Sequence, residues 1–112
     1  MANLLSTSID GLITEKQGTG AASGTTVTVD LATGNFFEID LQDASGDIAT
    51  FTINNAAAAH RSSFVLKITQ GSTAKDFPWS QLSAFKWAAA TAPTLTTTDN
   101  AVDILSFTTY DQ

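Results

Sequence analysis

The stretch TTVTVDLATGNFFEIDL, residues 25–41, decides the fold class, because its apolar residues recur at every second position on both sides of a short turn. Val27 and Val29 alternate with polar residues before the turn, and Phe37 and Ile39 alternate with acidic residues after it. A period of two places the apolar side chains on one face of a β-strand. The turn itself, ATGN, contains glycine and asparagine, which both tolerate positive φ. The pattern predicts a β-hairpin with one buried face.

Further short apolar segments follow this stretch, and turn-forming residues separate them. They lie at residues 48–53, 62–69, 77–79, 85–87, 94–97 and 101–110. None of the sequence has the 3.6-residue period of an amphipathic helix. Seven or eight short strands at this spacing predict an all-β fold, specifically an antiparallel β-sandwich that is jelly-roll-like.

The first 24 residues differ from the rest in composition. They comprise an arm with scattered apolar residues and then a Gly/Ser/Ala-rich stretch, KQGTGAASG, which predicts a flexible linker. The arm is either a frayed terminus or first edge strand, or a segment that lies on a partner as a capsid contact. We therefore divide the chain into residues 1–24, arm and linker, and residues 25–112, a β-sandwich domain. The apolar residues of the arm are Leu4, Leu5, Ile9, Leu12 and Ile13.

Composition narrows the classes of partner. A chain of 112 residues has room for one core, and its net charge of −6, with five scattered basic residues, disfavours nucleic acid and anionic membranes as partners. The absence of cysteine excludes disulfides and thiolate metal sites. The start of the chain lacks the pattern of a signal peptide, and no apolar run is long enough for a membrane span, so we expect a soluble product made in a cytoplasm. An exposed, threonine-rich strand edge favours a homo-oligomer.

Catalytic groups are sparse. His60 is the single histidine, and the sequence has no nucleophile elbow to accompany it, so we expect a surface residue. Glu38 and Asp40 share one face of a predicted strand, a spacing that a glycosidase acid/base pair would tolerate, but a solvated sheet face is the commoner meaning. The sequence predicts no catalytic residue and no enzyme.

A possible cation site lies in the loop DASGD, residues 43–47. Asp43, Ser45 and Asp47 alternate there as at the start of a calcium loop, yet no bidentate glutamate follows at the required distance. An ordinary turn capped by an aspartate side chain is the simpler interpretation. We predict no metal and no cofactor.

Residues 76–95 contain both tryptophans and both prolines of the chain. Their aromatic side chains either form a lid over the core, or present a stacking platform for sugars, or take part in a subunit interface. The core lid is the favoured alternative, because aromatic residues at alternate positions of a β fold usually pack inward. The residues concerned are Phe77, Trp79, Phe85 and Trp87.

Four strings resemble a β-rich module that recurs in virion proteins of tailed bacteriophages. They are TVDLATGNFFEIDL (28–41), ATFTINNAAA (49–58), SSFVLKITQ (62–70) and FPWSQLSAFKWAAATAPTLTTTDNAVDILSFTTYD (77–111). The order of elements is kept over residues 26–112. The chain departs from the family pattern where Pro78 precedes Trp79 and where three alanines follow the second tryptophan.

The resemblance implies a structural, non-enzymatic virion protein. For a small acidic β domain with an apolar arm, we expect a capsid decoration or cement protein on the outer surface of the head, assembled in the host cytoplasm. It would be a homotrimer with the major capsid protein as its partner. The alternative is a tail-fibre or receptor-binding module that contacts host surface glycan.

Overall fold

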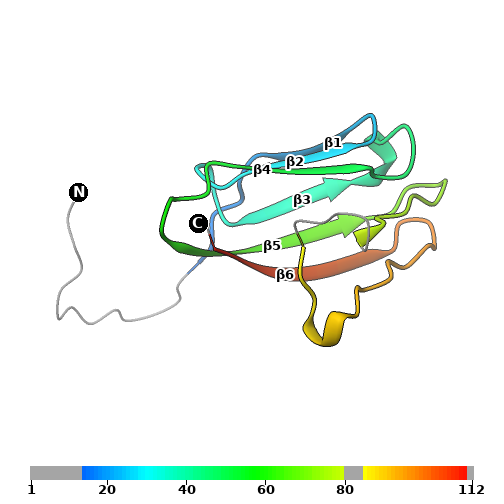
Figure 1. Ribbon diagram of the computed structural model, residues 1–112. Helices are drawn as coiled ribbons and strands as arrows, with labels where there is room; N and C mark the ends of the chain where they lie inside the picture. Colours follow the sequence, from blue (N-terminus) through cyan, green and yellow to red (C-terminus); the bar gives the residue numbers. More distant parts are fainter. Residues whose placement is uncertain (1–13, 80–84, 111–112) are drawn as a thin grey trace.

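The computed structural model describes residues 14–79 and 85–110, and these form six strands in two three-stranded sheets (Figure 1). Helical structure among them is limited to short 3₁₀ turns, η1 (Leu41–Asp43) and η3 (Ala88–Ala90), so this part of the chain has no helix that could cross a membrane. The all-β prediction is therefore confirmed. The strands are β1 (Gly20–Ser23), β2 (Thr26–Asp30), β3 (Phe36–Asp40), β4 (Thr50–Asn54), β5 (Arg61–Thr69) and β6 (Val102–Tyr110).

The two sheets are mixed in strand direction. One has the order β1-β2-β4 and the other the order β3-β5-β6. The pairs β1–β2 and β5–β6 are antiparallel, whereas β2–β4 and β3–β5 are parallel. The prediction of a purely antiparallel sandwich is therefore wrong for two of the four strand pairs.

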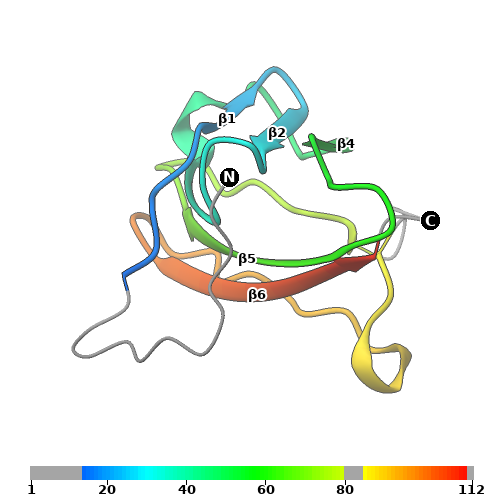
Figure 2. The same ribbon diagram turned by 90° about the vertical axis from the view of Figure 1, so that its left-hand side faces the viewer.

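The predicted hairpin over residues 25–41 is also wrong, although both of its strands exist. β2 and β3 lie in different sheets, and the chain alternates between the sheets from β2 to β5. Figure 2 shows β1, β2 and β4 in one layer and β5 and β6 in another. The alternation of apolar residues reports that each strand buries one face, but it does not say whether the turn joins neighbours in a sheet or crosses the core. Parallel pairing follows directly from such crossings.

The glycine-rich stretch predicted as a flexible linker contains ordered structure. Residues 20–23 form β1, which pairs with β2. Just before it, Gln17 forms a parallel bridge with Phe36, and Gly18 donates a backbone hydrogen bond of 2.8 Å to Phe36. Residues 17–23 thus pair with β3 in one sheet and with β2 in the other, and the linker prediction is wrong there. The apolar residues of the arm, Leu4, Leu5, Ile9, Leu12 and Ile13, lie outside the described residues.

One hydrophobic core lies between the sheets. Of the inward residues predicted from the alternation in the segments of β2, β3 and β5, Leu31 is only partly buried. The others are buried: Val27, Val29, Phe37, Ile39, Leu41, Phe64, Leu66 and Ile68. In the segment at residues 48–53 the alternation predicts Ala49, Phe51 and Ile53 on one face and Ile48 on the other. At its start this is inverted, because Ile48 is fully buried and Ala49 is exposed. Ile48 lies before β4, where its backbone N–H donates to Asp76 rather than to a neighbouring strand. The short segments at 77–79, 85–87 and 94–97 are not strands, although Phe77, Trp79 and Leu95 in them are buried in the core.

The crossing between β2 and β3 depends on a close approach at Gly34. A Cβ atom at this position would overlap the carbonyl oxygen of Lys16 and lie 2.6 Å from the backbone nitrogen of Gly18. Neither Gly34 nor Asn35 has positive φ. The glycine is needed for space against the preceding segment, not for the left-handed conformation that the turn sequence suggested.

Asp30 fixes the beginning of the same crossing. Its carboxylate accepts hydrogen bonds from the Asn55 side chain at 2.6 Å and from the Ala32 backbone N–H at 2.9 Å. These bonds tie the end of β2 to the loop after β4. They favour the ionised form, with the Asn55 bond as the larger cause, and hold the pKa of Asp30 below its ordinary value of 3.8.

We expect Gly34→Ala to destabilise the domain by about 1–3 kcal/mol, because the new methyl group would push the backbone of Lys16 and Gly18 away from residue 34. Gly46→Ala is the matched control, since its Cβ would meet only the Thr25 side chain at 3.7 Å. Urea unfolding followed by tryptophan fluorescence measures both. Equal stability of the two variants would contradict the steric account of this crossing.

We expect the Asp30 carboxylate to stabilise the fold in a pH-dependent way. Because its pKa is lowered by folding, its contribution is present above the unfolded-state pKa of about 3.9 and is lost as pH falls through the lower folded-state pKa. Wild type should therefore be more stable than Asp30→Asn at pH 7, and the difference should shrink below about pH 4. Thermal unfolding between pH 2 and 7 measures it, with Asp99→Asn as the control for loss of one exposed charge. A difference that does not change with pH would count against this role.

Candidate functional site

The two acidic residues considered as an acid/base pair have separate partners. Glu38 lies 3.4 Å from the ammonium group of Lys67, with both side chains well exposed. Asp40 caps the short helix η1 by accepting a hydrogen bond from the Gln42 backbone N–H at 2.9 Å. A glycosidase requires two carboxyl groups that face one bond, and these two do not converge on a common point. An exposed ion pair such as Glu38–Lys67 contributes at most about 1 kcal/mol.

His60 is exposed in the loop between β4 and β5. Its Nδ1 atom lies 2.6 Å from the Ala58 carbonyl oxygen, two residues earlier in the same loop. This local contact orients the ring within its own turn. The geometry agrees with a surface residue and does not present the imidazole to a nucleophile.

The DASGD loop serves the fold through Asp47. Its carboxylate accepts a hydrogen bond of 2.8 Å from the Asp76 backbone N–H, while the Asp76 carbonyl accepts from Ile48 at 2.8 Å. Asp43 lies in η1, so the alternating acids do not surround one point. Over residues 14–79 and 85–110, no group of three or more His, Cys, Asp or Glu side chains could hold a metal ion. The loop instead anchors the segment that leads to Phe77.

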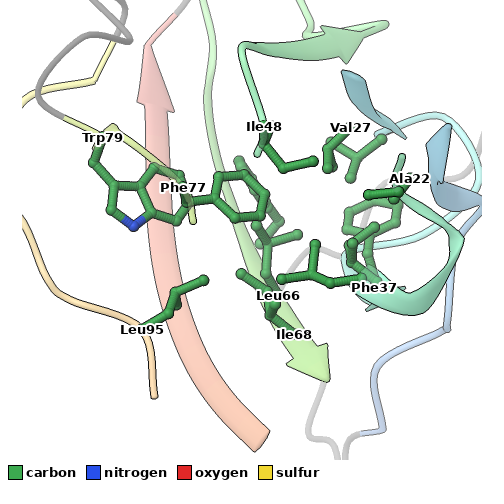
Figure 3. Packing of buried hydrophobic residues seen from close by; sticks show 14 residues of the cluster. Ala22, Val27, Phe37, Ile48, Leu66, Ile68, Phe77, Trp79 and Leu95 are labelled. Atoms are coloured by element: carbon green, nitrogen blue, oxygen red, sulfur yellow. The ribbon is translucent and has the colours of Figure 1, made fainter. Parts of the chain in front are cut away.

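The aromatic residues predicted as a core lid are packed against the core. Phe77 and Trp79 are each 2% exposed, and their rings stack with centroids 4.4 Å apart (Figure 3). Phe85 and Trp87 are partly buried and pack against the same cluster, with Trp87 edge-on to Trp79 at 5.3 Å. From β6, Phe107 joins the group. Trp79 therefore has no free ring face to offer a sugar.

The cluster is held by packing rather than by polar contacts. The indole N–H groups of Trp79 and Trp87 are buried, and neither has a hydrogen-bond partner among the described residues. Aromatic contacts of this kind contribute about 0.5–1.5 kcal/mol per pair beyond the burial of area. The cluster extends the core beyond β4, the edge strand of the β1-β2-β4 sheet, where Phe51 packs edge-on against Phe85 with ring centroids 5.2 Å apart.

A buried glutamine joins the loops around this cluster. Gln70, 3% exposed, follows directly after β5. Its amide nitrogen donates to the carbonyls of Lys75 at 2.9 Å and Thr96 at 3.3 Å, and its amide oxygen accepts from the Lys75 backbone N–H at 2.9 Å. The Gln70 side chain is thus hydrogen-bonded both to the loop before Phe77 and to the segment that contains Leu95. The sequence offered no signal for this role, since a glutamine in QGST is typical of a turn.

The broadest candidate surface is the side of the β3-β5-β6 sheet that faces away from the core, here called the outer face. Four apolar side chains lie on it, and the exposed large ones in the described residues, Val102 and Ile104, are both on β6. Hydroxyl groups surround them. In the strand register the outer face comprises Phe36, Glu38, Asp40, Arg61, Ser63, Val65, Lys67, Thr69, Val102, Ile104, Ser106 and Thr108.

A shallow hollow of about 180 Å³ lies at one end of the outer face. Glu15 borders it, together with the hydroxyl residues Ser63, Ser106 and Thr108. The sequence pattern did not predict this surface, because apolar residues occur on both faces of residues 101–110 and no inward face was assigned to them. In fact Leu105 and Phe107 point toward the core while Ile104 points outward.

The chain matches no known protein family, no curated protein and no solved structure.

We expect Gln70→Ala to destabilise the domain by about 1–3 kcal/mol, because it leaves the backbone groups of Lys75 and Thr96 without partners. Gln42→Ala is the matched control: its side chain is exposed and accepts hydrogen bonds from Ser72. The control should cost less than about 1 kcal/mol. Urea unfolding compares the two variants, and a loss at Gln42 equal to that at Gln70 would refute the joining role.

Proposed function

We propose that the protein is a non-enzymatic structural component of a tailed-bacteriophage virion, most specifically a decoration or cement protein that binds the outer surface of the head as a homotrimer. The observation that carries the proposal is the resemblance of residues 26–112 to the virion module described above. The proposal includes the fold: the two sheets form a sandwich, which is jelly-roll-like because the chain alternates between them.

The distribution of polar groups supports a role in surface contact. Glu38, Asp40, Asp47 and Asp30 each stabilise a different part of the fold through its own partner. Activity based on convergent acid and base groups would need them in one cleft. The described surface instead offers an outer face on β3, β5 and β6 with exposed apolar side chains among polar ones, as at an interface with a protein partner.

Multivalency gives such a protein its strength. Each copy of a chain of 112 residues can make only modest contacts with a shell. Joining three copies converts the second and third contacts into intramolecular events, so the trimer binds far more tightly than one copy. The proposed partners are further copies of this chain and the major capsid protein, and the proposed location is the outside of the head after assembly in the host cytoplasm.

Copy number in purified virions tests the proposal. A head decoration protein should be present in on the order of several hundred copies per virion, since it repeats with the symmetry of the shell. Quantitative mass spectrometry with an isotope-labelled standard of this chain measures the number. A few to a few dozen copies would sink the decoration role and favour the tail-fibre or receptor-binding alternative, which binding of the intact protein to a glycan array would then support.

A further inference from the structure

The outer face carries an apolar strip that the rest of the described chain does not cover. Ile104 is 66% exposed and Val102 is 47% exposed. Next to them, Val65 and Phe36 are paired in register, and neither is among the residues packed against the core. Apolar side chains gathered on one strand face in this way mark an interaction surface more often than a random exposed residue does.

The charge on the strip is nearly balanced. Lys67 lies in register between Glu38 on one side and Ile104 on the other, and it forms the 3.4 Å ion pair with Glu38. The strip therefore suits an apolar segment with little charge of its own. Residues 1–13 have this composition, because Asp10 is their one charged side chain.

Residues 14–17 approach one end of the β3-β5-β6 sheet. Gln17 pairs with Phe36 in parallel, so the chain before Gln17 heads toward the beginning of β5 and the end of β6. Glu15 accordingly borders the hollow with Ser63 and Thr108. Figure 1 shows this blue segment passing toward the end of the sheet at which β5 starts. Ile104 lies toward the other end of β6, so a straight continuation of the chain leads away from the copy's own strip.

From these observations we infer that residues 1–13 of one copy dock on the outer face of a neighbouring copy, over Val65, Val102 and Ile104. The inference rests on the proposed trimer and names its contact. Thirteen residues reach about 43 Å when extended, and the nine residues of β6 span about 30 Å, so the segment is longer than the strip it would cover. A contact between unlike surfaces forms a closed ring when the rotation between copies is that of a trimer, and an open filament otherwise.

Full-length variants test the arm exchange. Leu5→Asp/Ile9→Asp alters the arm, and Ile104→Asp alters the face that receives it; each should convert a trimer into monomers, with the contact about tenfold or more weaker. Ala21→Asp is the matched control, because it adds the same charge at an exposed strand position in the other sheet. Light scattering coupled to size-exclusion chromatography measures the mass, and circular dichroism checks that each variant is folded.

Mixing the variants gives the decisive result. The arm variant keeps an intact face and the Ile104→Asp variant keeps an intact arm, so the mixture should form heterodimers that neither variant forms alone. A wild-type monomer at all concentrations, or a mixture that stays monomeric, would overturn the inference. So would an arm variant that remains trimeric but no longer binds purified heads, since the arm would then contact the shell directly and the proposed function would stand. If the arm docks on a neighbouring copy but the protein is not found on heads, the docking is supported and the proposed location is refuted.

Discussion

The structure depends on one shared core that is buried from two sides by strands the chain supplies alternately. β2 and β4 cover it from one sheet, and β3 and β5 cover it from the other. Each strand buries only one face, so it is stable only when the opposite sheet is in place. The crossings between sheets are therefore as important as the strands. Asp30 and Gly34 shape the first of them, one through its hydrogen bonds and one through its lack of a side chain.

The same constraint explains the aromatic segment. Between β5 and β6 the chain leaves the sheet and returns across the open end of the core, where Phe77, Trp79 and Leu95 are buried. Gln70 joins the loops at both ends of this excursion. Both tryptophan side chains thereby pack against the core and stabilise it. The exposed large apolar side chains of the described residues, Val102 and Ile104, lie instead on the outer face of the β3-β5-β6 sheet.

Much of the fold could be predicted from local pattern. A period of two around Val27, Phe37 and Leu66 gave the strands and their buried faces correctly, because burial of alternate residues is a local property. Strand pairing is not local: the turn after Asp30 has the composition of a hairpin but crosses between sheets. There the Asp30 carboxylate accepts a hydrogen bond from Asn55, and Gly34 lies against Lys16. The outer strip was missed for a related reason, because Ile104 and Leu105 point in opposite directions and only three-dimensional placement tells which one is covered.

We propose that this β domain decorates the outside of a phage head in threefold clusters. Electron cryomicroscopy of virions that contain the protein tests this proposal, with an antibody fragment against the β domain as a label. The label should lie over the outer surface of the head, in groups of three copies. Label confined to the tail would refute the proposal.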